Sequence, residues 1–151
     1  MNIKKYNSKV ITKKSKSEGF GIFTDKNFKK DELVFVFSGK IVNWQKANYQ
    51  SLQIGKNKFI NPYKNNPGVY LNHSCNPNCF VKYPNKITSI KNIKKGEEIT
   101  IDYSTTVGTK KWKMECLCKS KNCRKIVEPY LEISDKLKNK YKNHTSEYLL
   151  Q

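Results

Sequence analysis

The segment Asn72-His73-Ser74-Cys75-Asn76-Pro77-Asn78 is the most informative part of this sequence. It is dense in polar and turn-forming residues, yet it directly follows the apolar pair Tyr70-Leu71. A polar segment that is entered from a buried strand is typical of a binding site, whereas Asn-Pro also favours an ordinary hydrogen-bonded turn. Both interpretations stay open for the segment alone, so its meaning depends on the rest of the chain.

The cysteines indicate a metal site. The chain has Cys75, Cys79, Cys116, Cys118 and Cys123. An odd, clustered set in a chain with no recognisable signal peptide argues for metal binding rather than disulfide bonds. The last three follow a C-x-C-x4-C spacing, which lets three thiolates share one ion, and a structural zinc needs a fourth ligand from elsewhere. Cys75 is the expected fourth ligand, and the alternatives are Cys79, His73 and His144.

Two further segments are ambiguous when each is taken alone. Gly96-Glu97-Glu98-Ile99-Thr100-Ile101-Asp102-Tyr103 predicts a glycine turn and then a strand that ends in a tyrosine, which is also the pattern of an ordinary core strand. Gly19-Phe20-Gly21 predicts a tight turn around an aromatic residue. Neither segment indicates a function without the other motifs.

The hydrophobic pattern predicts a mostly β fold with short helices. Strands are expected over residues 9–12, 21–24, 33–37, 41–42, 59–60, 80–83, 86–90 and 98–103. The apolar run 33–37 predicts a strand that is buried on both faces. Asn43 is expected to cap a short helix over 44–49, and Ser134 a terminal helix from 135 to about 143, with Leu137 and Tyr141 on one face. Residues 51–68 are otherwise expected to be loop.

Length and charge limit the possible functions. The chain has 151 residues, which suits one domain, and a net charge of +18. Arg124 is the only arginine, so the charge comes almost entirely from lysine, which lacks the bidentate fork of arginine. We expect a solvated lysine-rich surface with weak attraction to nucleic acid. No apolar run is long enough to predict a membrane span, so we expect no membrane partner and a cytoplasmic location.

Taken in order, these motifs resemble the SET-domain family of protein lysine methyltransferases. The order is Gly19-Phe20-Gly21, Phe37-Ser38-Gly39, the Asn72–Asn78 segment, Gly96 to Tyr103, and the C-x-C-x4-C cluster. The resemblance covers about residues 9–124 and is closest to compact bacterial, archaeal or viral members. It implies a β-clip-like fold with a knot-like C-terminal threading. It also implies a SET domain over 9–111, a zinc-binding post-SET segment over 112–127, and a helical tail over 128–151 that packs on the same domain.

The resemblance implies a binding site for S-adenosylmethionine, which would leave as S-adenosylhomocysteine. Gly19, Phe20 and Gly21 would surround its methionine end, and Asn72 and His73 would hold its adenosine part. The residues near the cofactor would also include Phe37, Tyr103, Trp112 and Leu117, with Met114 as an alternative cover for the adenine. Cys75, Cys116, Cys118 and Cys123 would bind one structural zinc.

The resemblance makes Tyr103 the catalytic tyrosine and places Tyr70 and Ile101 at the channel for the substrate lysine. Ile101 stands where the family commonly has Phe or Tyr, and it is smaller and has no hydroxyl. We therefore expect an enzyme that can add two or three methyl groups. Two other departures are Phe37, where the family has a tyrosine, and Val69, where it often has an arginine.

Two other classes of function compete with the enzyme. The lost hydroxyl at Phe37 suits a catalytically inactive SET-like binding module, and the charge of +18 suits a zinc-stabilised nucleic-acid-binding domain. For the enzyme, the substrate is a lysine-containing protein, with histone-like, ribosomal and host proteins as candidates. A host protein, and delivery to the host or the nucleus, applies if the source is a virus or an intracellular bacterium. Glu97, Glu98, Asp102 and Glu115 lie near the motifs and are expected to supply negative charge for a basic substrate.

Overall fold

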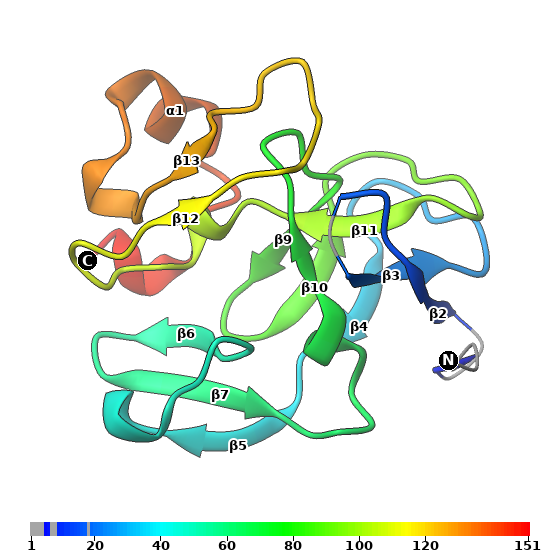
Figure 1. The fold of residues 1–151 in the computed structure, drawn as a ribbon, viewed down its shortest axis with the longest axis horizontal. Helices are drawn as coiled ribbons and strands as arrows, with labels where there is room; N and C mark the ends of the chain where they lie inside the picture. The colour runs from blue at the N-terminus through cyan, green and yellow to red at the C-terminus, as the bar shows by residue number, and fades with distance from the viewer. Residues whose placement is uncertain (1–4, 7–8, 18) are drawn as a thin grey trace.

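The computed structural model describes residues 5–6, 9–17 and 19–151, and these form short strands joined by turns (Figure 1). The only α-helix among the described residues is α1 (Asp135–Lys140). The strands are β1 (Lys5–Tyr6), β2 (Val10–Lys14), β3 (Phe20–Thr24), β4 (Leu33–Val36), β5 (Gly39–Val42), β6 (Leu52–Gly55), β7 (Lys58–Pro62), β8 (Asn72–His73), β9 (Cys79–Lys82), β10 (Lys86–Ser89), β11 (Glu98–Ile101), β12 (Met114–Glu115) and β13 (Ile126–Val127). The prediction of a mostly β chain with short helices is confirmed.

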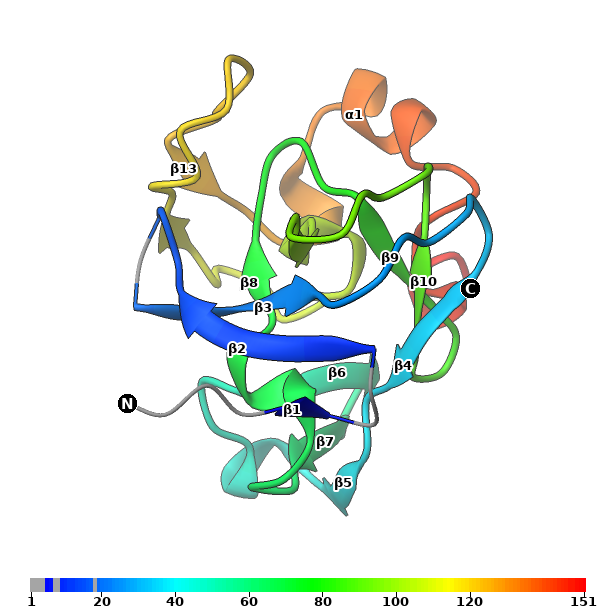
Figure 2. The same ribbon diagram turned by 90° about the vertical axis from the view of Figure 1, so that its right-hand side faces the viewer.

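The strands form several small sheets rather than one large one. The largest has the order β1-β2-β3-β11-β8, and two three-stranded sheets have the orders β4-β10-β9 and β5-β7-β6. The fourth is the β12-β13 pair. In both Figure 1 and Figure 2, β13 and α1 lie at one end of the molecule and the β5-β7-β6 sheet lies at the other. β13 with α1 and the β5-β7-β6 sheet thus lie on opposite sides of the central strands.

The short parallel pair of β8 and β11 positions the site. Asn72 pairs with Thr100 and His73 with Ile101, and the amide of Ser74 donates to the carbonyl of Ile101 over 3.0 Å. β11 also pairs antiparallel with β3, so three segments that are far apart in the sequence lie side by side. This pairing brings the Asn-His pair next to the residues that precede Tyr103. The knot-like threading stays a prediction.

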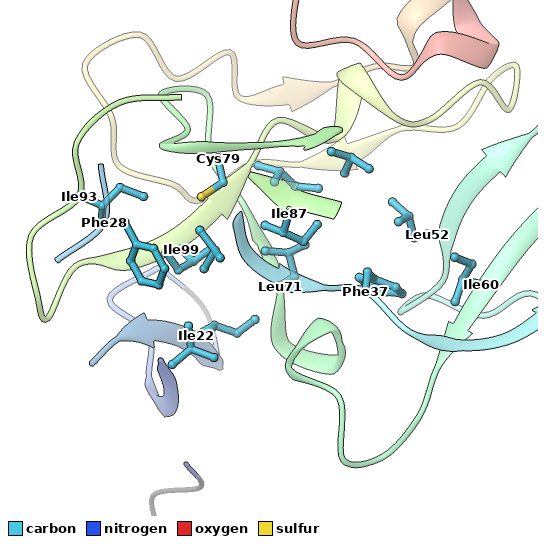
Figure 3. Packing of buried hydrophobic residues seen from close by; sticks show 14 of the residues in the cluster. Ile22, Phe28, Phe37, Leu52, Ile60, Leu71, Cys79, Ile87, Ile93 and Ile99 are labelled. Carbon is cyan, nitrogen blue, oxygen red and sulfur yellow. The ribbon is translucent and has the colours of Figure 1, made fainter. Parts of the chain in front are cut away.

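A single large apolar cluster packs between the sheets. Ile22, Ile87 and Ile99 are completely buried; Ile22 and Ile99 lie close to Phe28, and Ile87 lies next to Leu71 (Figure 3). Farther along in the same view, Phe37, Leu52 and Ile60 extend the cluster toward the β5-β7-β6 sheet. The core therefore joins the central strands to that sheet. Burial of such side chains stabilises each by about 1.5–3 kcal/mol relative to exposure.

The prediction that residues 33–37 are buried on both faces was wrong. Leu33 and Val36 are 39% and 41% exposed, whereas Val34 and Phe37 are 2% exposed. β4 is an edge strand of the β4-β10-β9 sheet, and its pairing with β10 is interrupted by a register shift, so its side chains do not all reach the core. The apolar run reflects β-propensity as well as burial.

The region predicted as loop between residues 51 and 68 contains strands. β6 is an addition to the expected elements, and β7 extends the short strand expected at 59–60. Pairing of β7 with both β5 and β6 supplies hydrogen bonds that no local pattern predicts. Farther along, Pro67–Tyr70 is a 3-10 helix, so the polar segment is not entered from a strand.

The helices differ from prediction in length. The helix expected over 44–49 is a 3-10 helix over Trp44–Lys46, and the side chain of Asn43 makes no capping bond. Its backbone carbonyl instead accepts from the amides of Lys46 and Ala47 over 3.1 Å each. The terminal helix ends three residues earlier than expected, at Lys140.

The C-terminal tail contacts the rest of the chain at several points. Ser134 caps α1 through its side chain, as predicted, and Tyr141 is 3% exposed with its hydroxyl 3.4 Å from the carbonyl of Cys75. The amide of Ser146 donates to the carbonyl of Thr105 over 2.9 Å. Within the described part of the chain, no helix is long and apolar enough to cross a membrane. The expectation that the chain has no signal peptide concerns its first residues, and residues 1–4 lie outside the described residues.

Candidate active site and metal centre

Four thiols converge at the C-terminal end of the molecule. The sulfur atoms of Cys75, Cys116, Cys118 and Cys123 all lie within 4.8 Å of one another. Cys75 follows β8, and the other three lie at the end of β12 and in the loop before β13. Cys75 and Cys116 are buried, and Cys118 and Cys123 are half-buried. The structure thus brings together the four cysteines that the sequence singled out.

The surroundings of these thiols fit a structural zinc site. Four cysteine ligands are a common set for tetrahedral zinc. The backbone amide of Arg124 points to the sulfur of Cys75 at 3.4 Å, and the hydroxyl of Ser120 lies 3.1 Å from the sulfur of Cys118. Donors of this kind stabilise metal-bound thiolates. The donor set and its second layer of contacts therefore suit one zinc ion held by the four thiols.

The alternative ligands lie elsewhere or have other partners. Cys79 is completely buried in the apolar core, and this burial raises the pKa of its thiol. The ring of His144 packs on Phe80 with 4.6 Å between centroids. His73 lies next to the cluster, with Nε2 3.4 Å from the sulfur of Cys75, but its Nδ1 accepts the amide of Tyr103 over 3.1 Å.

His73 connects the metal centre to Tyr103. Burial lowers the pKa of His73 to about 4; the charge of Arg124 also lowers it, and Asp102 partly opposes the shift. The imidazole is therefore neutral near pH 7, as its role as an acceptor for the amide of Tyr103 requires. The rings of His73 and Tyr103 also pack together, with centroids 5.3 Å apart.

A cavity of about 460 Å³ opens beside Tyr103. Its walls are formed by Phe37, Trp44, Ala47, Asn48, Tyr49, Gln50, Ser51, Leu52, Gln53, Phe59, Gly68, Val69, Leu71, Asn72, Ile101, Tyr103, Thr106, Val107, Thr109 and Trp112. The hydroxyl of Tyr103 donates to the carbonyl of Leu71 over 2.6 Å. Apolar walls with a few polar groups are the usual composition of a small-molecule site.

The side chain of Asn72 joins this cavity to the glycine segment of β3. Its amide donates to the carbonyl of Phe20 and to the carboxylate of Glu98, each over 2.9 Å. A Cβ atom on Gly21 would overlap the carboxylate of Glu98 and come within 3.1 Å of the Asn72 amide nitrogen. Gly19 has a φ of +53°, which favours glycine. Gly21 thus lets the backbone pass close to the side chain of Asn72, whereas Gly19 provides the turn before it.

The predicted site residues fall into two groups. Phe37, Asn72, Ile101, Tyr103 and Trp112 line the cavity, as does Val69, one of the noted departures. The others do not line it: Gly19, Phe20, Gly21, Tyr70, His73 and Leu117.

The members of the second group have other surroundings. The ring of Tyr70 packs edge-on against Phe20, with centroids 6.2 Å apart. Leu117 is 50% exposed in the loop of the thiol cluster. Met114, the alternative cover for the adenine, packs against the thiol cluster together with Trp112. Phe20 and Tyr70 thus lie on the neighbouring surface next to Asn72.

Sequence reasoning missed a buried ion pair between Asp102 and Arg124. Two nitrogens of the guanidinium donate to the two carboxylate oxygens over 2.7 and 2.8 Å, and the carboxylate is completely buried. Burial acts to lower the pKa of Arg124, but the hydrogen bonds and charge of Asp102 outweigh it and raise that pKa above its ordinary value. The available signal was that Arg124 is the only arginine in a lysine-rich chain.

Sequence reasoning also missed one wall of the cavity. Trp44, Tyr49, Leu52 and Phe59 belong to the β5-β7-β6 sheet and its connections, and all four line the cavity. Trp44 packs on Phe59 with 6.0 Å between centroids. The density of aromatic and aliphatic side chains in a segment otherwise rich in Asn and Lys was the signal for this wall.

Comparison with known proteins agrees with this geometry. A family model described as the SET domain matches residues 19–104. The chain is 29% identical over 140 residues to histone-lysine N-methyltransferase 2D of Homo sapiens, covering 80% of this chain and 2% of that protein. It is 29% identical over 136 residues to a variant-silencing SET domain-containing protein of Plasmodium falciparum, covering 74% of this chain and 5% of that protein. The chain thus spans a small fraction of the length of these relatives.

The fold also has a solved counterpart. The structure is similar to that of KRYPTONITE in complex with mCHH DNA, an H3(1-15) peptide and SAH, with a TM-score of 0.63 and 22% identity. This similarity covers 77% of this chain and 29% of that one, and it supports the fold. Because the SET-domain model matches more than half of the chain, from the glycine segment of β3 to the residue after Tyr103, this protein belongs to the SET-domain family.

Proposed function

We propose that this protein is a protein-lysine N-methyltransferase that uses S-adenosylmethionine. The observation that carries the proposal is the hydroxyl of Tyr103, held by the carbonyl of Leu71 at 2.6 Å on the wall of an uncharged cavity. The relatives named as histone-lysine N-methyltransferases support it.

The residues beside the cavity suit the proposed cofactor. Bound S-adenosylmethionine supplies an electrophilic methyl group on a positively charged sulfur and leaves as S-adenosylhomocysteine. Asn72, whose amide donates to the carbonyl of Phe20, offers a polar contact for its amino-acid end, and Trp112 offers an aromatic face for its base. The four-cysteine centre holds the segment that carries Trp112, so zinc would order one wall of the site.

The cavity favours the reactive form of a lysine side chain. Free lysine has a pKa of about 10.4, so only about 1 in 10³ molecules is neutral near pH 7. The apolar side chains of Phe37, Leu71 and Ile101 disfavour the charged ammonium, because burial penalises the charge. The lysine ammonium thus loses a proton to solvent, and the resulting neutral amine attacks the methyl group.

Tyr103 then acts as an orienting group. Its proton is used in the bond to Leu71, so its oxygen presents lone pairs to an N–H of the entering amine. That contact fixes the direction of the nitrogen lone pair, which must point at the methyl carbon for an in-line attack. Catalysis in this proposal comes from positioning and from desolvation of the amine. The zinc site has no part in the chemical step.

The experiment that tests the proposal measures cofactor binding and methyl transfer separately. Purified protein is incubated with labelled S-adenosylmethionine and a mixture of lysine-containing proteins, beside Tyr103→Phe and the control Tyr63→Phe. Tyr63 is 55% exposed and does not line the cavity. We expect Tyr103→Phe to bind the cofactor but to transfer label at least about 100-fold more slowly, and Tyr63→Phe to match the wild type.

The other outcomes identify the competing functions. Cofactor binding without transfer in the wild type would indicate an inactive SET-like binding module. Failure to bind the cofactor, together with salt-sensitive binding to DNA, would indicate a nucleic-acid-binding domain. Equal transfer by Tyr103→Phe and the wild type would remove the role assigned to the hydroxyl.

A further inference from the structure

We infer that the cavity selects lysines flanked by acidic or neutral residues, and disfavours lysines within basic segments. This inference rests on the proposed function and names the substrate class of the same site. It comes from the distribution of charge around the cavity, which differs sharply from that of the whole chain.

The walls of the cavity carry no ionisable Asp, Glu, Lys, Arg or His side chain. Charged residues make up 28% of the sequence, yet none occurs among the residues that line the cavity. The polar groups there are amides and hydroxyls, such as those of Asn48, Gln53 and Thr109. A carboxylate that would attract a second cationic side chain is thus missing from the walls.

Exposed lysines stand next to the lining residues in the sequence, and we call them the lysine rim. Five lysines are direct sequence neighbours of lining residues, namely Lys46, Lys58, Lys110, Lys111 and Lys113. Neighbouring Cα atoms are about 3.8 Å apart, so all five backbones lie close to lining residues. Lys58 precedes Phe59 on β7, so its side chain points to the other face of that strand, and the other four are the ones that bear on a bound peptide. All five residues are exposed. Among the described residues, Lys113 pairs with Glu128 at 3.3 Å, and the other four make no ion pair.

The acidic residues expected to attract a basic substrate are occupied or lie outside the cavity. Among the sequence neighbours of the lining residues, Asp102 is the acidic one. Its carboxylate is paired with Arg124. Glu98 accepts from Asn72 and Ser15, and Glu97 accepts from the amide of Lys94. Neither these residues nor Glu115 lines the cavity, and a role for them in attracting a basic substrate stays a prediction.

These observations favour an acidic or neutral partner by charge complementarity. A peptide that enters the cavity with a lysine must place the flanking residues near the lysines of the rim. Two carboxylates that contact the lysine rim are already engaged, because Glu128 pairs with Lys113 and Glu132 accepts from the amide of Lys111. Acidic flanking residues would therefore find unpaired cations such as Lys110, whereas basic ones would meet like charges. The effect acts on encounter and binding, and salt screens it over about 8 Å at physiological ionic strength. The discrimination should thus weaken as salt rises.

The test uses three peptides of equal length with one central lysine, flanked by glutamate, by serine or by arginine. We expect kcat/KM for the acidic peptide to exceed that for the basic peptide at least about tenfold at low salt, and the ratio to fall toward one at about 1 M salt. A charge-reversed variant, Lys110→Glu with Lys111→Glu, should lose or invert this preference. Its matched control is Lys91→Glu with Lys94→Glu, because both residues are exposed and neither neighbours a lining residue.

The outcomes separate this inference from the proposed function. Equal or better use of the basic peptide, or the same preference in both double variants, would overturn the inference while methyl transfer to the serine peptide still supported the enzyme. No transfer to any peptide would count against both. Loss of DNA or RNA binding in Lys110→Glu with Lys111→Glu, with peptide preference unchanged, would assign the rim to nucleic acid instead. Thermal unfolding midpoints of both variants check that the fold is intact.

Discussion

Asp102 and Arg124 form a bidentate ion pair, and each stands next in sequence to a residue of the site. Asp102 precedes Tyr103, and Arg124 follows Cys123, so the pair ties the tyrosine to the metal centre. The hydroxyl of Ser104 also receives a bond of 3.0 Å from the guanidinium. The zinc-binding segment and the end of β11 are thus one connected unit.

Loss of Arg124 should destabilise the protein strongly. Arg124→Ala leaves the buried carboxylate of Asp102 without its counter-ion, and we expect a loss of about 3 kcal/mol in the free energy of unfolding. Arg124→Lys should recover part of this, because it keeps the charge but not the two-pronged contact. Urea unfolding measures both. Lys121→Ala, at an exposed position in the same loop, serves as control; an equal effect there would contradict the role of the pair.

Zinc removal should increase the mobility and solvent exposure of the Trp112 side chain. This side chain packs against the thiol cluster and lies 6.4 Å from the ring of Tyr103. Trp44 is the second of the two tryptophans, so a Trp44→Phe background isolates its fluorescence. We expect a chelator to red-shift the emission and one equivalent of zinc to restore it, since metal binding orders the segment.

The metal content of cysteine variants provides an independent check on the ligand set. Cys118→Ser should lower zinc binding strongly, because it removes one of the four convergent thiols. Cys79→Ala should keep one zinc per chain, because Cys79 lies in the apolar core rather than in the cluster. Metal analysis of the purified variants measures this. Loss of zinc from Cys79→Ala alone would mean that the ligand set is wrong.

Gly21→Ala should weaken cofactor binding more than peptide binding. The added methyl group overlaps the carboxylate of Glu98 and crowds the amide of Asn72, so the contact of Asn72 with Phe20 is displaced. We expect KM for S-adenosylmethionine to rise at least about tenfold, with a much smaller change in KM for the peptide. Equal increases in both constants would point to a general loss of structure rather than a local effect.

Ile101 should permit more than one methyl transfer per lysine. It is 2% exposed and lines the cavity next to Tyr103, where it takes less space than an aromatic ring and holds no water through a hydroxyl. We expect di- or trimethyl-lysine from the wild type and a shift toward monomethyl-lysine in Ile101→Tyr. Mass spectrometry of the product at long times decides this. Monomethyl-lysine alone from excess wild-type enzyme would rule the idea out.

His144 should make the protein less stable in mild acid. Burial lowers the pKa of its imidazole below the ordinary value of about 6.5; Asp31 opposes this shift and Lys30 adds to it. Because the neutral ring packs on Phe80, its contribution is complete above about pH 6.5 and is lost as pH falls through the folded-state pKa. Urea midpoints at several pH values should fall less steeply for His144→Gln than for the wild type. Parallel curves would show that His144 does not contribute.

Residue type and spacing were enough to identify several of the chemical groups of this protein. The C-x-C-x4-C spacing predicts three of the ligands of a zinc site, because ligand type and local spacing are read from the sequence, whereas the fourth, Cys75, had three alternatives. Tyr103 and the Asn-His pair were ambiguous in their own segments, and only the order of all the motifs along the chain singled them out. Ser134 at the start of α1 was predicted from its residue type and position, because its capping bond is local.

How these groups are connected, and what surrounds them, depends on contacts between distant parts of the chain. The contact of Asp102 with Arg124 and the parallel register of β8 and β11 join residues more than 20 positions apart, where no local pattern carries information. The wall from the β5-β7-β6 sheet depends on strand pairing, which is why a segment that looked like loop lines the cavity. The uncharged walls and lysine rim arise in the same way, because composition counts charges but only packing determines which side chains face a shared space.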